Sequence, residues 1–165
     1  MRLASADVAA PFILDVLARD GSAWVRESSE SMGPLMRAGD RLRLVAAARV
    51  AAGDVIAYHR GGDIVVHRVI SSRGPFVITK GDALFRRDEP VARDAVVGRV
   101  ATVAPPGASY IELDSARWRA LARVLAVMSR LAERVAPACP AAPTWRRLAW
   151  MAARLPMHVV AWTVR

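Results

Sequence analysis

The chain has 165 residues, of which 54% are hydrophobic, and its formal net charge is +9. A hydrophobic fraction of this size can fill the core of one domain and excludes a chain that is disordered throughout. The single cysteine, Cys139, excludes both an internal disulfide bond and a zinc site made of cysteines.

The positive charge is concentrated near the C-terminus. Residues 1–114 contain 15 basic and 14 acidic side chains, whereas residues 115–165 contain nine arginines and one acid, Glu133. A nearly neutral body followed by a segment of net charge +8 indicates an anionic partner for that segment. Such a partner would be a membrane surface, a nucleic acid or an acidic protein.

The N-terminal segment, residues 1–21, is predicted to hold a short helix over residues 11–19. Pro11 opens this helix and Gly21 follows its end. Two aspartates interrupt the mildly apolar run that a signal peptide would need, and no uncharged stretch is long enough to span a bilayer. The protein is therefore expected in the cytoplasm.

Residues 22–114 have the pattern of a compact β unit, in which four Gly-Asp pairs punctuate short apolar runs. A Gly-Gly-Asp turn at residues 61–63 predicts a hairpin. The segment between Gly81 and Arg93 is expected to be irregular. The predicted strands are residues 22–27, 41–45, 55–59, 64–70, 76–80, 95–103 and 110–113.

From residue 115 onward the apolar residues recur at helical rather than at strand spacing. A proline-rich link, residues 137–143, would end a first helix, and Thr144 would cap a second one. Residues 115–165 are thus predicted to form a basic, amphipathic, helical tail. In its first helix one apolar stripe, opposite the arginines, would be formed by Leu121, Val124, Leu125, Met128, Leu131 and Val135.

The side chains of a serine hydrolase occur in the β unit in the order serine, histidine, aspartate. Ser31 lies in a turn, His67 lies in the middle of an apolar strand, and Asp82 and Asp88 follow a Lys-Gly turn. Serine becomes a strong nucleophile when a base takes its proton and a third group orients that base. His67 would be the base, and Lys80, the only lysine, is the alternative. Taken singly, His67 would be a core histidine and each aspartate a turn residue.

Five motifs in this order resemble those of signal peptidases of the archaeal and endoplasmic-reticulum type. That type has histidine where the bacterial housekeeping type has lysine. One such motif alone is common, but five in order over residues 24–103 are specific. They are Ser31-Met32-Gly33-Pro34 with Gly39-Asp40, Gly53-Asp54-Val55-Ile56, His67-Arg68-Val69-Ile70, Thr79-Lys80-Gly81-Asp82 with Asp88, and Val97-Gly98-Arg99-Val100.

The resemblance implies a mostly β fold, the coiled β-sheet unit shared with the SOS-repressor self-cleaving proteases. The short N-terminal helix and the helical C-terminal tail are predicted from the residue pattern alone, and the basic tail has no counterpart in the five motifs. The resemblance also implies a serine endopeptidase that cleaves a peptide or preprotein and needs no cofactor or metal. Ser31 would be the nucleophile, His67 the general base and Asp88 the orienting acid. Asp82 would be the second acid of its motif. The oxyanion would be held by the Ser31 N–H, with help from the hydroxyl of Ser29.

Departures from the family pattern keep other functions open. Glu30 stands where the family usually has glycine, and a carboxylate there would oppose a developing oxyanion. Arg87 stands where many members have an aspartate, and the sequence is not expected to provide the usual N-terminal membrane anchor. The alternative is a catalytically impaired adaptor of the same fold that binds peptides.

The basic tail, residues 115–165, suggests that the protein is attached peripherally to an anionic membrane surface, at the inner face of the cell membrane. A nucleic-acid-binding module is disfavoured, because the charge lies on a tail and no helix-turn-helix or aromatic RNA-binding motif occurs.

Overall fold

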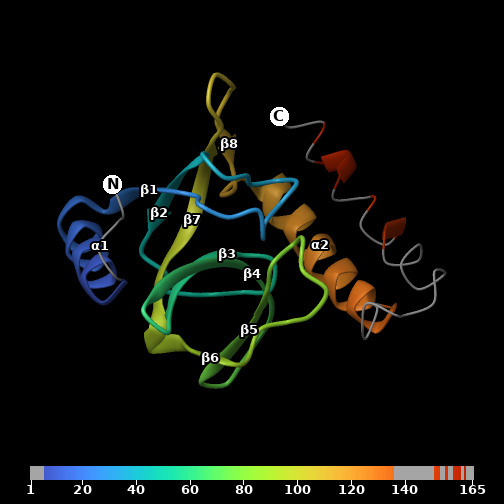
Figure 1. The fold of residues 1–165 in the computed structure, drawn as a ribbon, viewed down its shortest axis with the longest axis horizontal. Helices are drawn as coiled ribbons and strands as arrows, with labels where there is room; N and C mark the ends of the chain where they lie inside the picture. Colours follow the sequence, from blue (N-terminus) through green and yellow to red (C-terminus); the bar gives the residue numbers. More distant parts are fainter. Residues whose placement is uncertain (1–5, 136–150, 153–154, 156–157, 161, 163–165) are drawn as a thin grey trace.

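The computed structural model describes residues 6–135 and, beyond them, residues 151–152, 155, 158–160 and 162. An antiparallel sheet lies between helix α1 (Ala6–Asp20) and helix α2 (Ala116–Val135), as Figure 1 shows. The prediction of a mostly β fold with a helix before the sheet and a helix after it is confirmed. The proline-rich link, Cys139 and the predicted cap at Thr144 lie outside the described residues.

Eight strands form one sheet in the order β1-β2-β7-β3-β4-β5-β6, and β8 pairs with β7. The predicted strands agree with the observed ones to within three residues. The short strand β6 falls in the segment expected to be irregular, because two residues are too few to show an alternating pattern. The strands are β1 (Ser22–Arg26), β2 (Arg41–Val45), β3 (Val55–Arg60), β4 (Asp63–Arg73), β5 (Phe76–Lys80), β6 (Val91–Ala92), β7 (Val96–Ala104) and β8 (Ile111–Glu112).

Helix α1 contains Pro11, so the prediction that this proline opens the helix is wrong. Pro11 is exposed, whereas Ala10, Ile13 and Leu17 on the opposite face are buried in the core. Burial of that face outweighs the hydrogen bond that proline cannot donate. Gly21 follows the end of the helix as predicted, with a left-handed φ of 73° and its N–H on the carbonyl of Leu17.

Both faces of the sheet carry apolar clusters. Along β3, Val55 and Ala57 belong to the larger cluster, which α1 and α2 help to form, while Ile56 and Tyr58 belong to the smaller one. Successive side chains of a strand point to opposite faces, so the sheet is covered on both sides in this region.

Helix α2 packs on the sheet with a face that differs from the predicted apolar stripe. Of that stripe, Leu125 is buried, whereas Val124 and Leu131 are exposed. Alanines on the inner face allow a close approach to the sheet beside Trp118 and Leu125, while Val124, Val127 and Leu131 are left on the outer face. No described helix is both long and apolar enough to cross a bilayer. The buried side chains of α2 are Trp118, Ala122, Leu125, Ala126, Ser129 and Ala132.

Gly53 marks the point where α2 approaches the turn before β3. It has a φ of 104°, and a Cβ atom built on it would lie 2.7 Å from the backbone carbon of Ala122. A side chain there would collide with the helix backbone, so glycine is required for this packing. Helix α2 is therefore an integral part of the body of the protein.

Candidate active site

Ser31 lies in the loop between β1 and β2. This loop is held by backbone hydrogen bonds between its two ends and by its own buried side chains. The N–H of Glu27 donates to the carbonyl of Asp40 at 2.9 Å, and the N–H of Gly39 donates to the carbonyl of Glu27 at 2.8 Å. Apolar side chains of the same loop anchor it in the core, so the backbone around Ser31 is held in place. These buried side chains are Met32, Leu35 and Met36.

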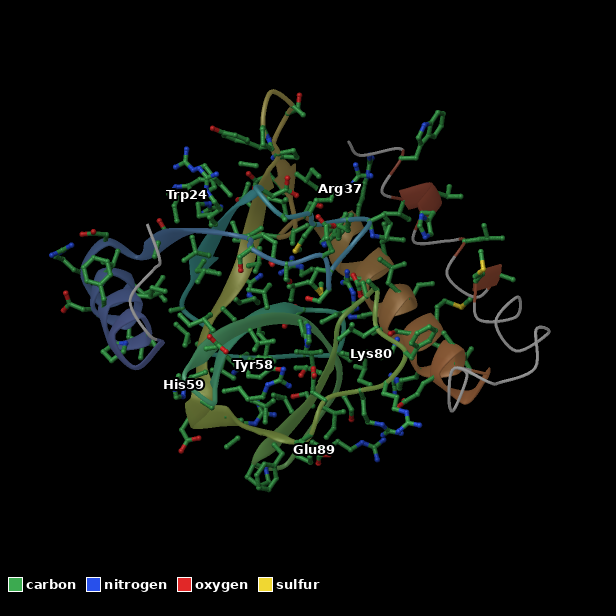
Figure 2. The ribbon with its side chains drawn as sticks, viewed as in Figure 1. Trp24, Arg37, Tyr58, His59, Lys80 and Glu89 are labelled. Carbon is green, nitrogen blue, oxygen red and sulfur yellow. The ribbon has the colours of Figure 1, made fainter. Side chains whose placement is uncertain are left out.

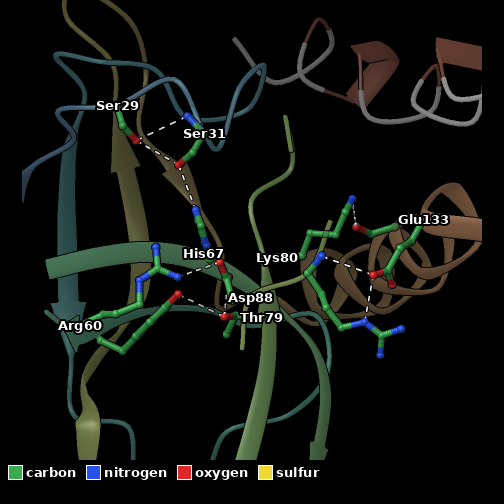
Figure 3. Close-up of polar contacts among 11 residues, drawn as sticks. Ser29, Ser31, Arg60, His67, Thr79, Lys80, Asp88 and Glu133 are labelled. Atoms are coloured by element: carbon green, nitrogen blue, oxygen red, sulfur yellow. Dashed lines mark hydrogen bonds and ion pairs between the residues drawn. The ribbon is translucent and has the colours of Figure 1, made fainter. Parts of the chain in front are cut away.

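Ser31, His67 and Asp88 form one continuous line of polar contacts (Figure 3). Ser31 Oγ lies 3.2 Å from His67 Nε2, and His67 Nδ1 lies 2.6 Å from Asp88 Oδ2. An ionised carboxylate only accepts hydrogen bonds, so Nδ1 carries the proton of the neutral ring and Nε2 presents its lone pair to Ser31. A buried imidazole in this tautomer can take the Ser31 hydroxyl proton.

Asp88 lies in the loop after β5 and is held by further contacts. Its N–H donates to the carbonyl of Thr79 at 2.8 Å, the Thr79 hydroxyl donates to Oδ2 at 2.7 Å, and Arg60 donates to Oδ1 at 3.0 Å. Burial by itself raises the pKa of Asp88, but hydrogen bonds from His67, Thr79 and Arg60 outweigh it and lower the pKa from 3.8 to about 2. The carboxylate therefore stays ionised throughout the neutral range.

The lowered pKa of Asp88 predicts a specific acid dependence of stability. A carboxyl whose pKa falls on folding stabilises the protein above its unfolded pKa, near 3.8, and that contribution is lost as the pH falls through about 2. We expect Asp88→Asn to be less stable than the wild type near neutral pH, and the difference to shrink between about pH 4 and pH 2. Urea unfolding of both proteins across this range measures it. A difference that stays constant would contradict the observed contacts.

Asp82 pairs with Arg68 rather than with His67. Arg68 donates from Nε to Oδ1 at 2.9 Å and from Nη2 to Oδ2 at 2.7 Å, and both side chains are fully buried. Nη1 of Arg68 donates to the carbonyl of Gly53 at 2.9 Å. The aspartate of the Lys-Gly-Asp motif thus neutralises the arginine of the His-Arg motif beneath α2.

Thr79 and Lys80 are neighbours in β5, so their side chains point to opposite faces of the sheet. Thr79 faces Asp88, whereas Lys80 lies beside α2 (Figure 2) and donates from Nζ to Ser129 Oγ at 3.0 Å. Lys80 is only 1% exposed. The geometry therefore favours His67 over Lys80 as the base for Ser31.

Ser29 lies directly beside the nucleophile. Its Oγ is 2.9 Å from Ser31 Oγ and 3.4 Å from the backbone nitrogen of Ser31. The Ser29 hydroxyl also donates to Glu27 Oε1 at 2.9 Å. The structure thus brings Ser29 into contact with both groups of Ser31 that the sequence analysis assigned to the reaction.

The two residues that depart from the family pattern both have partners. Glu30 is exposed, and its Oε1 accepts from the N–H of Ala38 at 3.2 Å, across the loop that carries Ser31. Arg87 donates from Nε to Glu133 of α2 at 2.9 Å. Helix α2 therefore braces the loop that carries the acid (Figure 3).

Sequence reasoning missed the residues that support the site. Gly81 lets two loops meet, because a Cβ atom there would lie 2.7 Å from the carbonyl oxygen of Ser31 and 2.9 Å from His67 Nε2. Gly81 and Thr79 both stand in a motif already singled out, so that motif carried a signal for their importance. Arg60 precedes a hairpin turn, and no sequence pattern links it to Asp88, 28 residues later.

The chain matches no protein-family model and none of the curated proteins with which it was compared. The choice of function therefore depends on the geometry of this site and on the motifs.

Proposed function

We propose that this protein is a signal-peptidase-like serine endopeptidase, with Ser31 as nucleophile, His67 as general base and Asp88 as orienting acid. The observation that carries the proposal is the line from Ser31 Oγ to His67 Nε2 at 3.2 Å and from His67 Nδ1 to Asp88 Oδ2 at 2.6 Å. Three loops or strands far apart in the sequence converge to make this line. If these residues were unrelated turn and core residues, we would expect neither this convergence nor five motifs in order.

In the proposed reaction, Ser31 Oγ attacks the scissile carbonyl carbon while His67 Nε2 takes the hydroxyl proton. The new C–O bond forms and the carbonyl electron pair moves onto oxygen. Collapse of this intermediate breaks the C–N bond, and His67 returns the proton to the leaving amine. A water molecule then repeats the sequence on the acyl-enzyme and frees Ser31. Asp88 stays ionised and stabilises the imidazolium form of His67 in both halves.

The sheet offers a place for an extended peptide or preprotein substrate. Strand β1 lies at one edge of the sheet and runs directly into the loop that carries Ser29 and Ser31. The outer edge of such a strand can pair with an added strand through backbone hydrogen bonds. We propose that the substrate binds along this edge, which would bring its scissile bond to Ser31.

A fluorophosphonate probe separates the endopeptidase from an inactive adaptor of the same fold. Such a probe reacts with a serine that a neighbouring base activates, and a site that only binds peptide would not react. We expect one label per chain, located on Ser31 by peptide mapping. The absence of labelling, with peptide binding retained, would favour the adaptor.

We also propose that α2 and the residues after it hold the protein on an anionic membrane surface, at the inner face of the cell membrane. The outer face of α2 exposes Val124, Val127 and Leu131, at helical spacings of three and four. An apolar face next to arginines suits the headgroup region, where each basic side chain contributes about 1 kcal/mol. The neighbouring row on α2 holds Arg119, Arg123 and Arg130, and beyond α2 the exposed apolar residues include Met151, Leu155, Val159 and Trp162.

The double variant Val124→Asp/Leu131→Asp is expected to lose binding to vesicles of phosphatidylglycerol and phosphatidylcholine, because two charges replace the apolar face. The wild type should sediment with these vesicles at low salt, and added salt should release only part of it. Phe12→Asp is the matched control, because Phe12 is 66% exposed on α1, which lies at the opposite end of the sheet from α2 (Figure 1).

No binding by the wild type at low salt would contradict the membrane proposal. A chain ending at Val135 keeps all of α2 and tests the contribution of residues 136–165, with its thermal melting as a check because Val160 packs against the core. A chain ending at Asp114 would confuse the result, because it removes Trp118 and Leu125 from the core and should melt at a lower temperature.

A further inference from the structure

Glu27 is a buried acid that the reaction described above does not use. It follows β1 directly and is 5% exposed. Its Oε1 accepts from both the N–H and the hydroxyl of Ser29, each at 2.9 Å. Its Oε2 is buried with no hydrogen-bond partner in the described part of the chain. Leaving a buried carboxylate oxygen unpaired costs free energy, so a functional reason for this acid is expected.

The contacts of Glu27 set the direction of the hydrogen bonds around the nucleophile. The single hydroxyl proton of Ser29 goes to Glu27, so Ser29 Oγ accepts from Ser31, and the Ser31 hydroxyl proton is shared between Ser29 Oγ at 2.9 Å and His67 Nε2. Ser31 Oγ is farther from His67, at 3.2 Å. A chain of hydrogen bonds from Ser31 through Ser29 to Glu27 therefore fixes the Ser29 hydroxyl beside the nucleophile.

We propose that Glu27 is a positioning residue that acts through Ser29, an inference that rests on the proposed peptidase function. Before attack, Glu27 holds the Ser29 hydroxyl against Ser31. When the proton of Ser31 passes to His67, the Ser29 hydroxyl turns toward the developing oxyanion and donates to it. The bond from the Ser29 N–H to Glu27 Oε1 keeps the residue in place while its hydroxyl turns. A donor held ready in this way stabilises the oxyanion without reorganisation of the loop.

A double-mutant cycle between Glu27→Gln and Ser29→Ala tests this role, with the rate of fluorophosphonate labelling as readout. In the labelling step the Ser31 Oγ–P bond forms, the P–F bond breaks, fluoride leaves with the electron pair, and His67 takes the proton of Ser31. Ser29→Ala should lower the maximal labelling rate about a hundredfold, as loss of one oxyanion donor does. Glu27→Gln should lower it about tenfold, because a neutral acceptor holds the hydroxyl less firmly than a charged one.

The decisive expectation is that Glu27→Gln has no further effect once Ser29 is alanine. The probe concentration for half-maximal rate should stay unchanged throughout, because Glu27 does not touch the probe. Glu89→Gln, which removes the charge of an exposed glutamate next to Asp88, is the control and should label at the wild-type rate.

If Glu27→Gln lowers the labelling rate equally with serine and with alanine at position 29, or lowers it in neither, the positioning role is overturned. Labelling at Ser31 would still support the peptidase in that case. Glu27→Asp serves if Glu27→Gln melts at a much lower temperature, because aspartate keeps the charge and falls one methylene short of Ser29. Glu27→Asp should likewise lower the labelling rate when Ser29 is present and have no further effect in the Ser29→Ala background. A wild-type protein that is not labelled at Ser31 would overturn the proposed peptidase itself.

Discussion

Ser31→Ala is expected to abolish peptide-bond cleavage and to leave the unfolding temperature close to that of the wild type. Loss of the nucleophile of a serine hydrolase costs on the order of 10⁶-fold in turnover. The Ser31 hydroxyl contacts Ser29 and His67 in a half-exposed turn and contributes little packing, so we expect a stability change within about 0.5 kcal/mol. Cleavage of a defined peptide library, read by mass spectrometry, and thermal melting measure the two quantities.

Ser28→Ala is the matched control for the nucleophile. Ser28 lies in the same loop and is exposed, so its loss should leave both cleavage and melting unchanged. Cleavage by Ser31→Ala at the wild-type rate would remove Ser31 from the mechanism. Lys80→Arg should remain substantially active if His67 is the base, because Lys80 donates to Ser129 from the face of β5 that points away from Asp88.

A wild-type protein that binds peptides without cleaving them would point to the adaptor. In that case Glu30 is the first residue to change, because it stands directly before the nucleophile. Its carboxylate is bonded to the N–H of Ala38 rather than buried, so Glu30→Gly removes the charge without opening a cavity in the core. Recovery of cleavage by this variant would show that the charge opposes the oxyanion.

The sheet was largely predictable because its strands alternate in polarity and its turns carry glycine with aspartate. Two errors arose where tertiary packing outweighs a local rule. Pro11 sits inside α1 because the opposite face of that helix is buried, and helical spacing in α2 located a real apolar face without showing which face meets the sheet. Ala122 and Ala126 are buried instead of Val124, and the backbone of α2 at Ala122 approaches Gly53 so closely that only glycine fits, which periodicity does not reveal.

The site was predictable as a set of residue types and not as a network of contacts. The motifs placed a serine, a histidine and two aspartates in order, but spacing does not tell which aspartate reaches the imidazole. The structure resolves this by pairing Asp82 with Arg68 and Asp88 with His67. The link from Glu27 to Ser29 was hidden because a glutamate two residues before a serine has no characteristic pattern.

The two aspartates therefore predict opposite effects of the same substitution. Asp88→Asn should lower turnover about ten-thousandfold, because asparagine beside Nδ1 no longer enforces the tautomer that presents a lone pair to Ser31. Asp82→Asn should leave the buried charge of Arg68 without its partner and lower the free energy of unfolding by about 3–5 kcal/mol. Cleavage rates and urea unfolding at neutral pH measure both effects for each variant.

The comparison is made per folded molecule, because a destabilised Asp82→Asn would lose activity simply by unfolding. Titration with the fluorophosphonate counts the folded, reactive sites, and the cleavage rate divided by that count should be near the wild-type value for Asp82→Asn. A larger loss per site in Asp82→Asn than in Asp88→Asn would reverse the two assignments. If neither substitution changes turnover, the carboxylate at 2.6 Å does not orient His67, and a mechanism based on the Ser31–His67 contact alone would have to explain cleavage.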